Sequence, residues 1–162
     1  MDQNMSRPLK ALNVMVEAET TVAEFYRVCS EKFTEHSTFW DSLAREEMAH
    51  AEVIRKLIEL VNIQPNEFTA GKPTPLDAIK AFIARTKSNI ETLQRGSLPE
   101  EKALLIAYHI ENTVIEAQYA DVVNTENQEY TALLAQIIAE TLKHKETVVG
   151  KMRDLKNARK LP

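Results

Sequence analysis

An acid and an imidazole on the apolar face of one predicted helix constrain this sequence most. In the stretch 40–61, apolar side chains recur at alternating spacings of three and four residues, as on the buried face of a helix. Glu47 and His50 occupy two positions of that face. Because an unpaired carboxylate in an apolar core costs several kcal/mol, Glu47 needs a partner. The Glu-x-x-His spacing sets both groups one turn apart on one side of the helix. There they can hold one cation, or form a hydrogen-bonded pair in a metal-free bundle.

Composition favours one all-α domain over residues 1–162. The chain has 162 residues with only 3 Gly and 6 Pro, which suits a helical fold with a substantial core. Its net charge of −4 argues against nucleic acid or an anionic membrane surface as a partner. The single cysteine, Cys29, excludes an internal disulfide and a four-cysteine metal site within one chain. Without a membrane-length apolar run or a signal-like segment, we expect a soluble, cytoplasmic protein.

Periodicity and end signals predict five helices. They are expected at about residues 7–35, 38–62, 75–95, 99–125 and 128–157. The segment 63–74 is predicted to be a connection, since it contains two prolines and a glycine. Thr74 and Ser97 are predicted to cap the helices that follow them, and Gly96 to end the third helix.

The pattern of acids and histidines repeats along the chain. Glu19 and the five residues after it match the segment that starts at Glu111, and His50 matches His144 at nearly the same separation. Glu47 matches Thr141 in this alignment. Two similar helical hairpins packed face to face would bring these positions to one layer, with residues 63–96 as a long crossover between them.

This ordered set of residues resembles the ferritin-like superfamily, and within it the diiron domain of rubrerythrin. The resemblance rests on Glu19 with Phe25 and Tyr26 behind it, on the stretch 45–52, and on the hairpin repeat. It implies a ferritin-like four-helix bundle that holds two iron ions, possibly one, with Mn or Zn as possible alternatives. The metal ligands that it implies are Glu19, Glu47, His50, Glu111 and His144.

The resemblance also implies a role for each residue. Glu47 would bridge the ions, the two histidines would be terminal ligands, and Glu19 and Glu111 would cap one ion each. Tyr26 would hydrogen-bond a ligating carboxylate, and Tyr119 is a weaker candidate for the same part.

The chain departs from the family pattern at three points. Thr141 stands where the second Glu-x-x-His motif has its acid, and Val114 where a second acid usually follows Glu111. No rubredoxin-like tail can form from one cysteine. Two divalent ions facing three carboxylates and two neutral imidazoles would leave a net charge of about +1. An added anion or an inward-turned Glu140, otherwise expected in solvent, would offset that charge.

By this resemblance, the expected activity is non-haem diiron redox chemistry, either peroxide reduction or Fe(II) oxidation. An external electron-donor protein would supply the electrons, and we expect a homodimer from the family's habit. Two alternatives remain open from the sequence. One is an iron storage or carrier module without turnover, and the other is a metal-poor bundle that acts by protein association.

Overall fold

The computed structural model describes residues 5–113 and 121–158, and these residues are mainly α-helical. The helices within them are α1 (Ser6–Lys32), α2 (Ser37–Ile63), α3 (Leu76–Gln94), α4 (Glu100–Glu111) and α6 (Gln128–Ala158). The predicted all-α class is therefore confirmed. Apart from the end of α4, the helix ends lie within three residues of their predicted positions. In the described part of the chain, no helix has the length and apolar character needed to span a bilayer.

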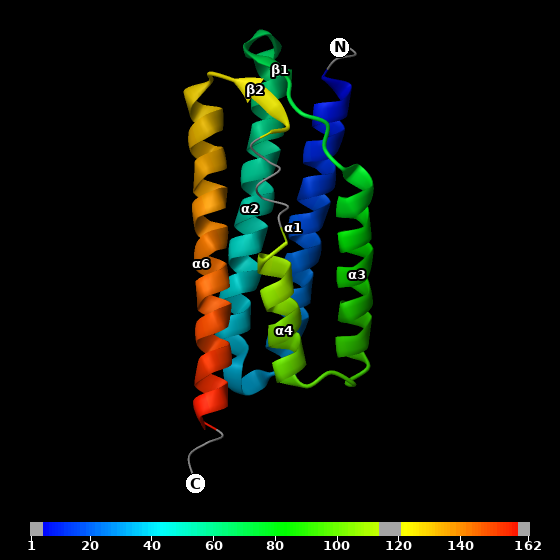
Figure 1. The fold of residues 1–162 in the computed structure, drawn as a ribbon, viewed down its shortest axis with the longest axis vertical. Helices are drawn as coiled ribbons and strands as arrows, with labels where there is room; N and C mark the ends of the chain where they lie inside the picture. The colour runs from blue at the N-terminus through cyan, green and yellow to red at the C-terminus, as the bar shows by residue number, and fades with distance from the viewer. Residues whose placement is uncertain (1–4, 114–120, 159–162) are drawn as a thin grey trace.

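The helices lie side by side with their long axes nearly parallel (Figure 1). Helix α1 packs against both α2 and α3, while α6 packs against α2 and α4. Helix α4 also contacts α1, so α1, α2, α4 and α6 surround a common interior. Helix α3 lies at the edge far from α6 (Figure 1). A side chain that points inward from α1, α2, α4 or α6 can therefore meet side chains from the other three of these helices.

Large apolar side chains fill this interior. Their alternation of three and four residues along each helix puts them on one face, which is what buries them together. Helices α1 and α2 contribute most of the largest fully buried side chains. Those side chains are Leu12, Met15, Phe25, Tyr26, Trp40, Leu43, Ile54, Leu57, Ile79, Leu93 and Tyr130.

A short antiparallel ribbon replaces part of the predicted fourth helix. Strand β1 (Phe68–Ala70) pairs with β2 (Val123–Thr125), with Phe68 opposite Thr125. The prediction of a helix over 99–125 was therefore wrong at its end, because α4 stops at Glu111 and residues 123–125 are a strand. β-branched residues at 122, 123 and 125 disfavour a helix and suit a strand. The connection predicted for 63–74 contains the partner strand.

Asn127 joins this ribbon to the start of α6. Its Oδ1 accepts the backbone N–H of Tyr130 at 2.9 Å, which satisfies one of the free donors in the first turn of the helix. Its Nδ2 donates to Gln64 Oε1 at 2.8 Å and to Glu67 Oε2 at 2.6 Å. The C-terminal end of α2 and the beginning of α6 are thereby fixed to each other.

The predicted helix ends are right at one position and wrong at two. Gly96 follows α3 with a φ of 76°, the left-handed conformation that favours glycine at a helix end. The predicted caps Thr74 and Ser97 do not cap. Helices α3 and α4 instead start after Pro75 and Pro99, with no side-chain hydrogen bond at either cap. Proline needs no N–H partner there and presets the backbone, so a polar cap is less needed.

Replacing Gly71 with alanine should destabilise the fold. Its N–H donates to Val122 O at 3.0 Å, and an added Cβ would lie only 2.0 Å from Asp121 O. Because that obstacle is backbone, the Gly71→Ala variant should lose about 1–3 kcal/mol of unfolding free energy in urea titrations. A Cβ at Gly150, inside α6, meets nothing within 4 Å. The matched Gly150→Ala variant should therefore gain up to about 1 kcal/mol. Equal stability of the two variants would contradict this account.

Candidate metal centre

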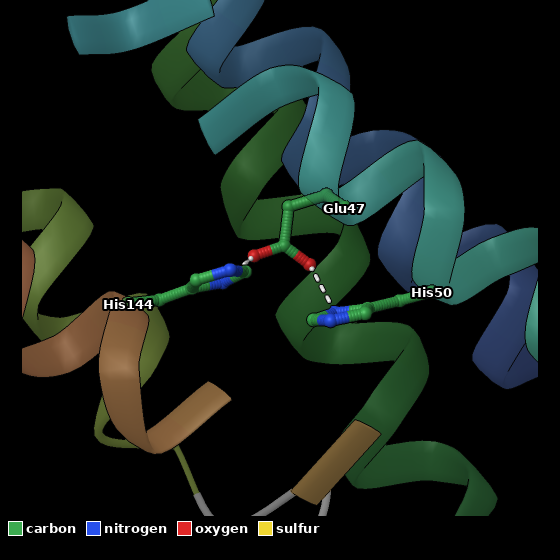
Figure 2. Close-up of side chains that lie close together, drawn as sticks. All are labelled: Glu47, His50 and His144. Carbon is green, nitrogen blue, oxygen red and sulfur yellow. Dashed lines mark hydrogen bonds and ion pairs between the residues drawn. The ribbon is translucent and has the colours of Figure 1, made fainter. Parts of the chain in front are cut away.

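Glu47 lies between two imidazoles in the interior of the bundle (Figure 2). Its Oε2 is 3.2 Å from His50 Nδ1, and its Oε1 is 2.9 Å from His144 Nδ1. The two rings are nearly parallel, with centroids 5.1 Å apart and planes 19° apart. All three residues are buried, with at most 4% of their surface exposed. A single carboxylate therefore contacts both histidines, one through each oxygen.

The helical periods that pack the core also bring these residues together. Glu47 and His50 are one turn apart on α2, in line with the buried Leu43 and Ile54. His144 occupies the equivalent place on α6, between the buried Ile137 and Val148. Because α2 packs against α6, both histidines point to the same level of the bundle interior. We call the buried polar residues at this level the layer.

Two outer carboxylates contact the far sides of the same rings. Glu46 Oε2, on α2, is 2.7 Å from His144 Nε2 on α6. Glu140 Oε2, on α6, is 3.2 Å from His50 Nε2 on α2. The Glu46 side chain is 56% exposed and that of Glu140 is 35% exposed, so both reach inward from the surface. Glu140 was expected in solvent, with an inward-turned side chain as the alternative, and the alternative is the one observed.

Sequence reasoning missed Glu46 altogether, although a signal for it exists. In the alignment of the two hairpins, Glu46 matches Glu140 just as His50 matches His144. The pairing is therefore reciprocal, since each helix supplies the outer carboxylate for the histidine of the other helix.

Glu111 and Tyr26 border the other side of the layer. Tyr26 Oη donates to Glu111 Oε1 at 2.5 Å, and both residues are buried. Glu111 Oε2 is 3.9 Å from His144 Nδ1. The structure thus contains the hydrogen bond that was expected between Tyr26 and a carboxylate of the site. Glu111 is the last residue of α4, whereas its repeat-mate Glu19 lies well inside α1.

Glu19 approaches the layer from α1. It is buried, and its side chain hydrogen-bonds the Glu47 carboxylate. Beside them is a cavity of about 10 Å³, close to the least space that a single water needs. Its lining combines three carboxylates with apolar side chains: Glu19, Glu47, Glu111, Ala18, Val22, Phe82 and Ile110.

Thr141 lies in the layer but directs its hydroxyl elsewhere. It is buried, and its Oγ1 donates to Ile137 O at 3.1 Å, one turn earlier on α6. Thr141 therefore brings no charge to the layer, and its hydroxyl is already bonded to its own helix. Val114 and Tyr119, the other positions singled out in the sequence, lie outside the described residues.

Burial and hydrogen bonding shift the ionisation of this group in opposite directions. Burial raises the pKa of the Glu47 carboxyl, but hydrogen bonds with His144, His50 and Glu19 outweigh it and hold that pKa well below its usual range. Burial disfavours the charged form of His144, but its hydrogen bond to Glu47 and the nearby acids raise its pKa to about 9. Without a metal, this layer therefore consists of an anionic carboxylate with at least one cationic imidazole.

The donor set of Glu47, His50 and His144 could hold a metal ion. One ligand atom from each residue can be chosen so that all three lie within 4.8 Å of one another. Two imidazoles and a carboxylate are a combination that binds zinc, iron or manganese in proteins. Comparisons with protein-family models, with curated proteins and with solved structures found no match to this chain.

In chelator-treated protein, stability should be greatest between about pH 4.5 and 6.5. The stabilisation from His144 is complete below its ordinary pKa of 6.5 and is lost as the pH rises through about 9. That from Glu47 is complete above its ordinary pKa of 4.5 and is lost in acid. Denaturant titrations across this range should show a loss of about 1–3 kcal/mol on the alkaline side.

A substitution identifies the group responsible for the alkaline loss. The His144→Gln variant should be less stable at pH 6 and nearly independent of pH from 6 to 9, because its side chain does not titrate. His109→Gln changes an exposed histidine of α4 and should keep the wild-type slope. An unchanged slope in His144→Gln would show that another group carries the effect.

Proposed function

We propose that this chain is a rubrerythrin-like non-haem metal protein that reduces peroxide or oxidises Fe(II). One observation carries the proposal. Among the described residues, the buried polar and charged side chains other than two threonines all belong to this layer: Glu19, Glu47, His50, Glu111, Thr141 and His144. The two exceptions, Thr21 and Thr86, bond the backbone of their own helices.

The charges of the layer favour a cation as its occupant. Three buried carboxylates face two imidazoles, and no lysine or arginine is buried in the described part of the chain. Buried acids usually require a charged partner or a metal. A divalent ion between Glu47 and the two Nδ1 atoms would replace hydrogen bonds that now satisfy those groups. This makes metal binding a better explanation of five converging buried groups than packing alone.

The outer carboxylates support this orientation of the rings. A carboxylate beside Nε2 accepts the proton of that nitrogen, which leaves the Nδ1 lone pair facing the interior. Glu46 does this for His144 and Glu140 for His50. They also bring two negative charges to the rim of a site that lacks one at Thr141. Neither lies beside Nδ1, so neither replaces the missing bridge.

The carboxylate cavity suggests a second ion position of different character. Its polar lining is oxygen from Glu19, Glu47 and Glu111, whereas the first position has two nitrogens. Glu47 belongs to both, as a bridging ligand would. Hard oxygen ligands favour Fe or Mn, while the imidazole position also suits Zn. We therefore propose iron, with one ion held better near Glu47 and His50 and a weaker second one.

The resemblance to rubrerythrin supplies the remaining parts of the proposal. In a ferritin-like bundle, α1–α2 and α4–α6 would be the two hairpins and α3 would belong to the crossover. Bound iron would supply one-electron redox chemistry, and the chain would position the ion and exclude bulk water. Electrons would come from an external donor protein, since the chain has one cysteine. A homodimer is proposed from the family's habit alone.

A metal-poor bundle is the rival function, and one observation favours it. Each nitrogen of both histidines already has a carboxylate within 3.2 Å, so the layer can satisfy itself without an ion. Storage or transport of iron without turnover is the other alternative. Measured metal content separates the metal-poor bundle from our proposal. Measured turnover with peroxide or Fe(II) separates iron storage or transport from it.

Metal stoichiometry should distinguish one strong site from two. Protein from iron-supplemented cells should contain less than two ions per chain, because Thr141 supplies no carboxylate ligand. The Thr141→Glu variant should rise toward two ions. Without metal it should be destabilised by about 3 kcal/mol, because its new buried charge would lack a partner. Elemental analysis and thermal unfolding with and without Fe(II) provide the measurements. Thr131→Glu, an exposed position on α6, is the matched control.

The possible results separate the functions. No ions in either protein would favour the metal-poor bundle. Tight binding of iron without reduction of peroxide by a surrogate reductant, and without Fe(II) oxidation, would favour storage or transport. Two tightly bound ions in the wild type would show that another anion fills the place of the missing carboxylate.

Removing either outer carboxylate should weaken metal binding. Substitution of groups that orient metal-bound histidines commonly costs about 10–100-fold in affinity. We expect such a loss for Glu46→Ala and for Glu140→Ala in competition titrations with a chelator. The Gln variants should lose less, since an amide oxygen still accepts from Nε2. Glu59→Ala and Glu146→Ala, exposed positions on the same helices, should not change the affinity. Equal affinity in all variants would exclude the orienting role.

A further inference from the structure

Two oxidisable aromatic side chains lie in series beside the candidate metal centre. The ring centroids of Tyr26 and Trp40 are 6.0 Å apart with their planes tilted by 32°. Both side chains have no exposed surface, and Trp40 is the only tryptophan of the chain. Phenol and indole are the protein side chains from which an electron is most readily removed, apart from sulfur. At this separation an electron can pass between them without an intermediate group.

Each of the two rings donates its polar hydrogen to a carboxylate. Tyr26 Oη donates to Glu111 Oε1 at 2.5 Å, and Trp40 Nε1 donates to Glu100 Oε1 at 2.9 Å. Removing an electron from a phenol or an indole makes its O–H or N–H a strong acid. A carboxylate in hydrogen-bond contact can take that proton as the electron leaves, which avoids a buried cation. Both rings therefore have the base that oxidation requires.

The series has one end at the site and the other near the surface. Glu111 Oε2 is 3.9 Å from His144 Nδ1, so Tyr26 is one residue away from the imidazole layer. At the far end, Glu100 also contacts His36, with Oε2 2.9 Å from Nδ1. The side chains of Glu100 and His36 are 17% and 23% exposed. This pair lies where η1 (Thr34–His36) meets the start of α4.

Burial alone does not account for these pairings. Tyr130 is buried to almost the same degree, and its hydroxyl has no hydrogen-bond partner within the described residues. The fold therefore accepts a buried phenol without a carboxylate beside it. Glu100 is likewise a largely buried acid that joins a surface histidine to a core indole.

We propose that Tyr26 and Trp40 form an electron-transfer path between the metal centre and the surface at Glu100 and His36. The proposal rests on the redox function proposed above. It goes beyond that function by assigning the route of the electrons and the face on which a one-electron donor acts.

The steps balance in electrons and protons. Tyr26 gives one electron to the oxidised centre, and its proton passes to Glu111. Trp40 then gives one electron to the Tyr26 radical, which takes its proton back from Glu111, while the Trp40 N–H proton passes to Glu100. Because the phenol is the easier group to oxidise, this step is uphill and is driven forward by rapid reduction of Trp40. A one-electron donor at the surface reduces Trp40, and the proton returns from Glu100. The net result is transfer of one electron from that donor to the centre.

The central step can be tested in chelator-treated protein, where no metal function is needed. A laser flash at a wavelength that tryptophan alone absorbs would photoionise Trp40 and leave an indolyl radical. Near neutral pH a hydrogen-bonded phenol is the easier group to oxidise. The indolyl absorption should therefore decay as a phenoxyl absorption grows, at a rate independent of protein concentration.

Two variants identify the tyrosine that gives the phenoxyl absorption. In Tyr26→Phe the growth of the phenoxyl absorption should be lost and the indolyl radical should live longer. In Tyr130→Phe, which removes a buried tyrosine outside the series, both rates should be unchanged. Phenoxyl growth that persists in Tyr26→Phe would overturn the path. If that variant does not fold, the wild type still decides, because absence of concentration-independent phenoxyl growth would also overturn it.

A second experiment separates failure of the path from failure of the metal function. Iron-loaded protein would be mixed with peroxide and a small one-electron reductant, frozen after set times, and examined by electron paramagnetic resonance. Trp40→Phe should accumulate a longer-lived tyrosyl radical than the wild type, and Tyr26→Phe should lose that radical. The same radical and lifetime in all three proteins would overturn the path. A protein that binds no iron but passes the flash experiment would overturn the metal function and leave the aromatic coupling intact.

Discussion

The carboxylate of Glu47 is the contact on which the rest of the site depends. It is buried and anionic, and it reaches one imidazole from its own helix and one from α6 through its two oxygens. A buried charge of this kind must be satisfied, and losing a partner would cost several kcal/mol. Helices α2 and α6 are therefore held in the register that keeps His50 and His144 beside it. Glu19, Glu111 and the outer carboxylates are arranged around that contact.

Burying the charged groups of the layer costs folding free energy, and the apolar parts of the bundle must offset that cost. Buried ion pairs are rarely a net source of stability, whereas the apolar side chains on either side of this layer are. On α2 these are Trp40 and Leu43 on one side and Ile54 and Leu57 on the other. Five titratable groups are buried between these two apolar regions. Because they add little to the stability of the fold, a role in binding or catalysis explains their presence better. This is the strongest physical argument for a bound metal ion in the layer.

Sequence reasoning predicted the parts of the structure that depend on periodicity. The spacing of apolar residues located the helices, and the same spacing placed Glu47, His50 and His144 on the interior. It failed where the deciding interaction is not periodic. The β1–β2 pairing joins segments far apart in the chain, so the β-branched residues at 122, 123 and 125 were read as the end of a helix. Glu46 was overlooked because its Cα lies off the core face and only its long side chain reaches the site.

The outer carboxylates change the meaning of Thr141. If only the three buried carboxylates and the two histidines are counted, two divalent ions would leave an excess positive charge, because Thr141 replaces a fourth acid. Glu46 and Glu140 add two negative charges at the Nε2 atoms, so the total charge no longer forbids a second ion. What remains missing is a ligand atom on the Thr141 side, where the hydroxyl is bonded to its own helix. The departure at Thr141 from the rubrerythrin pattern that the sequence resembles is therefore one of coordination geometry rather than of charge.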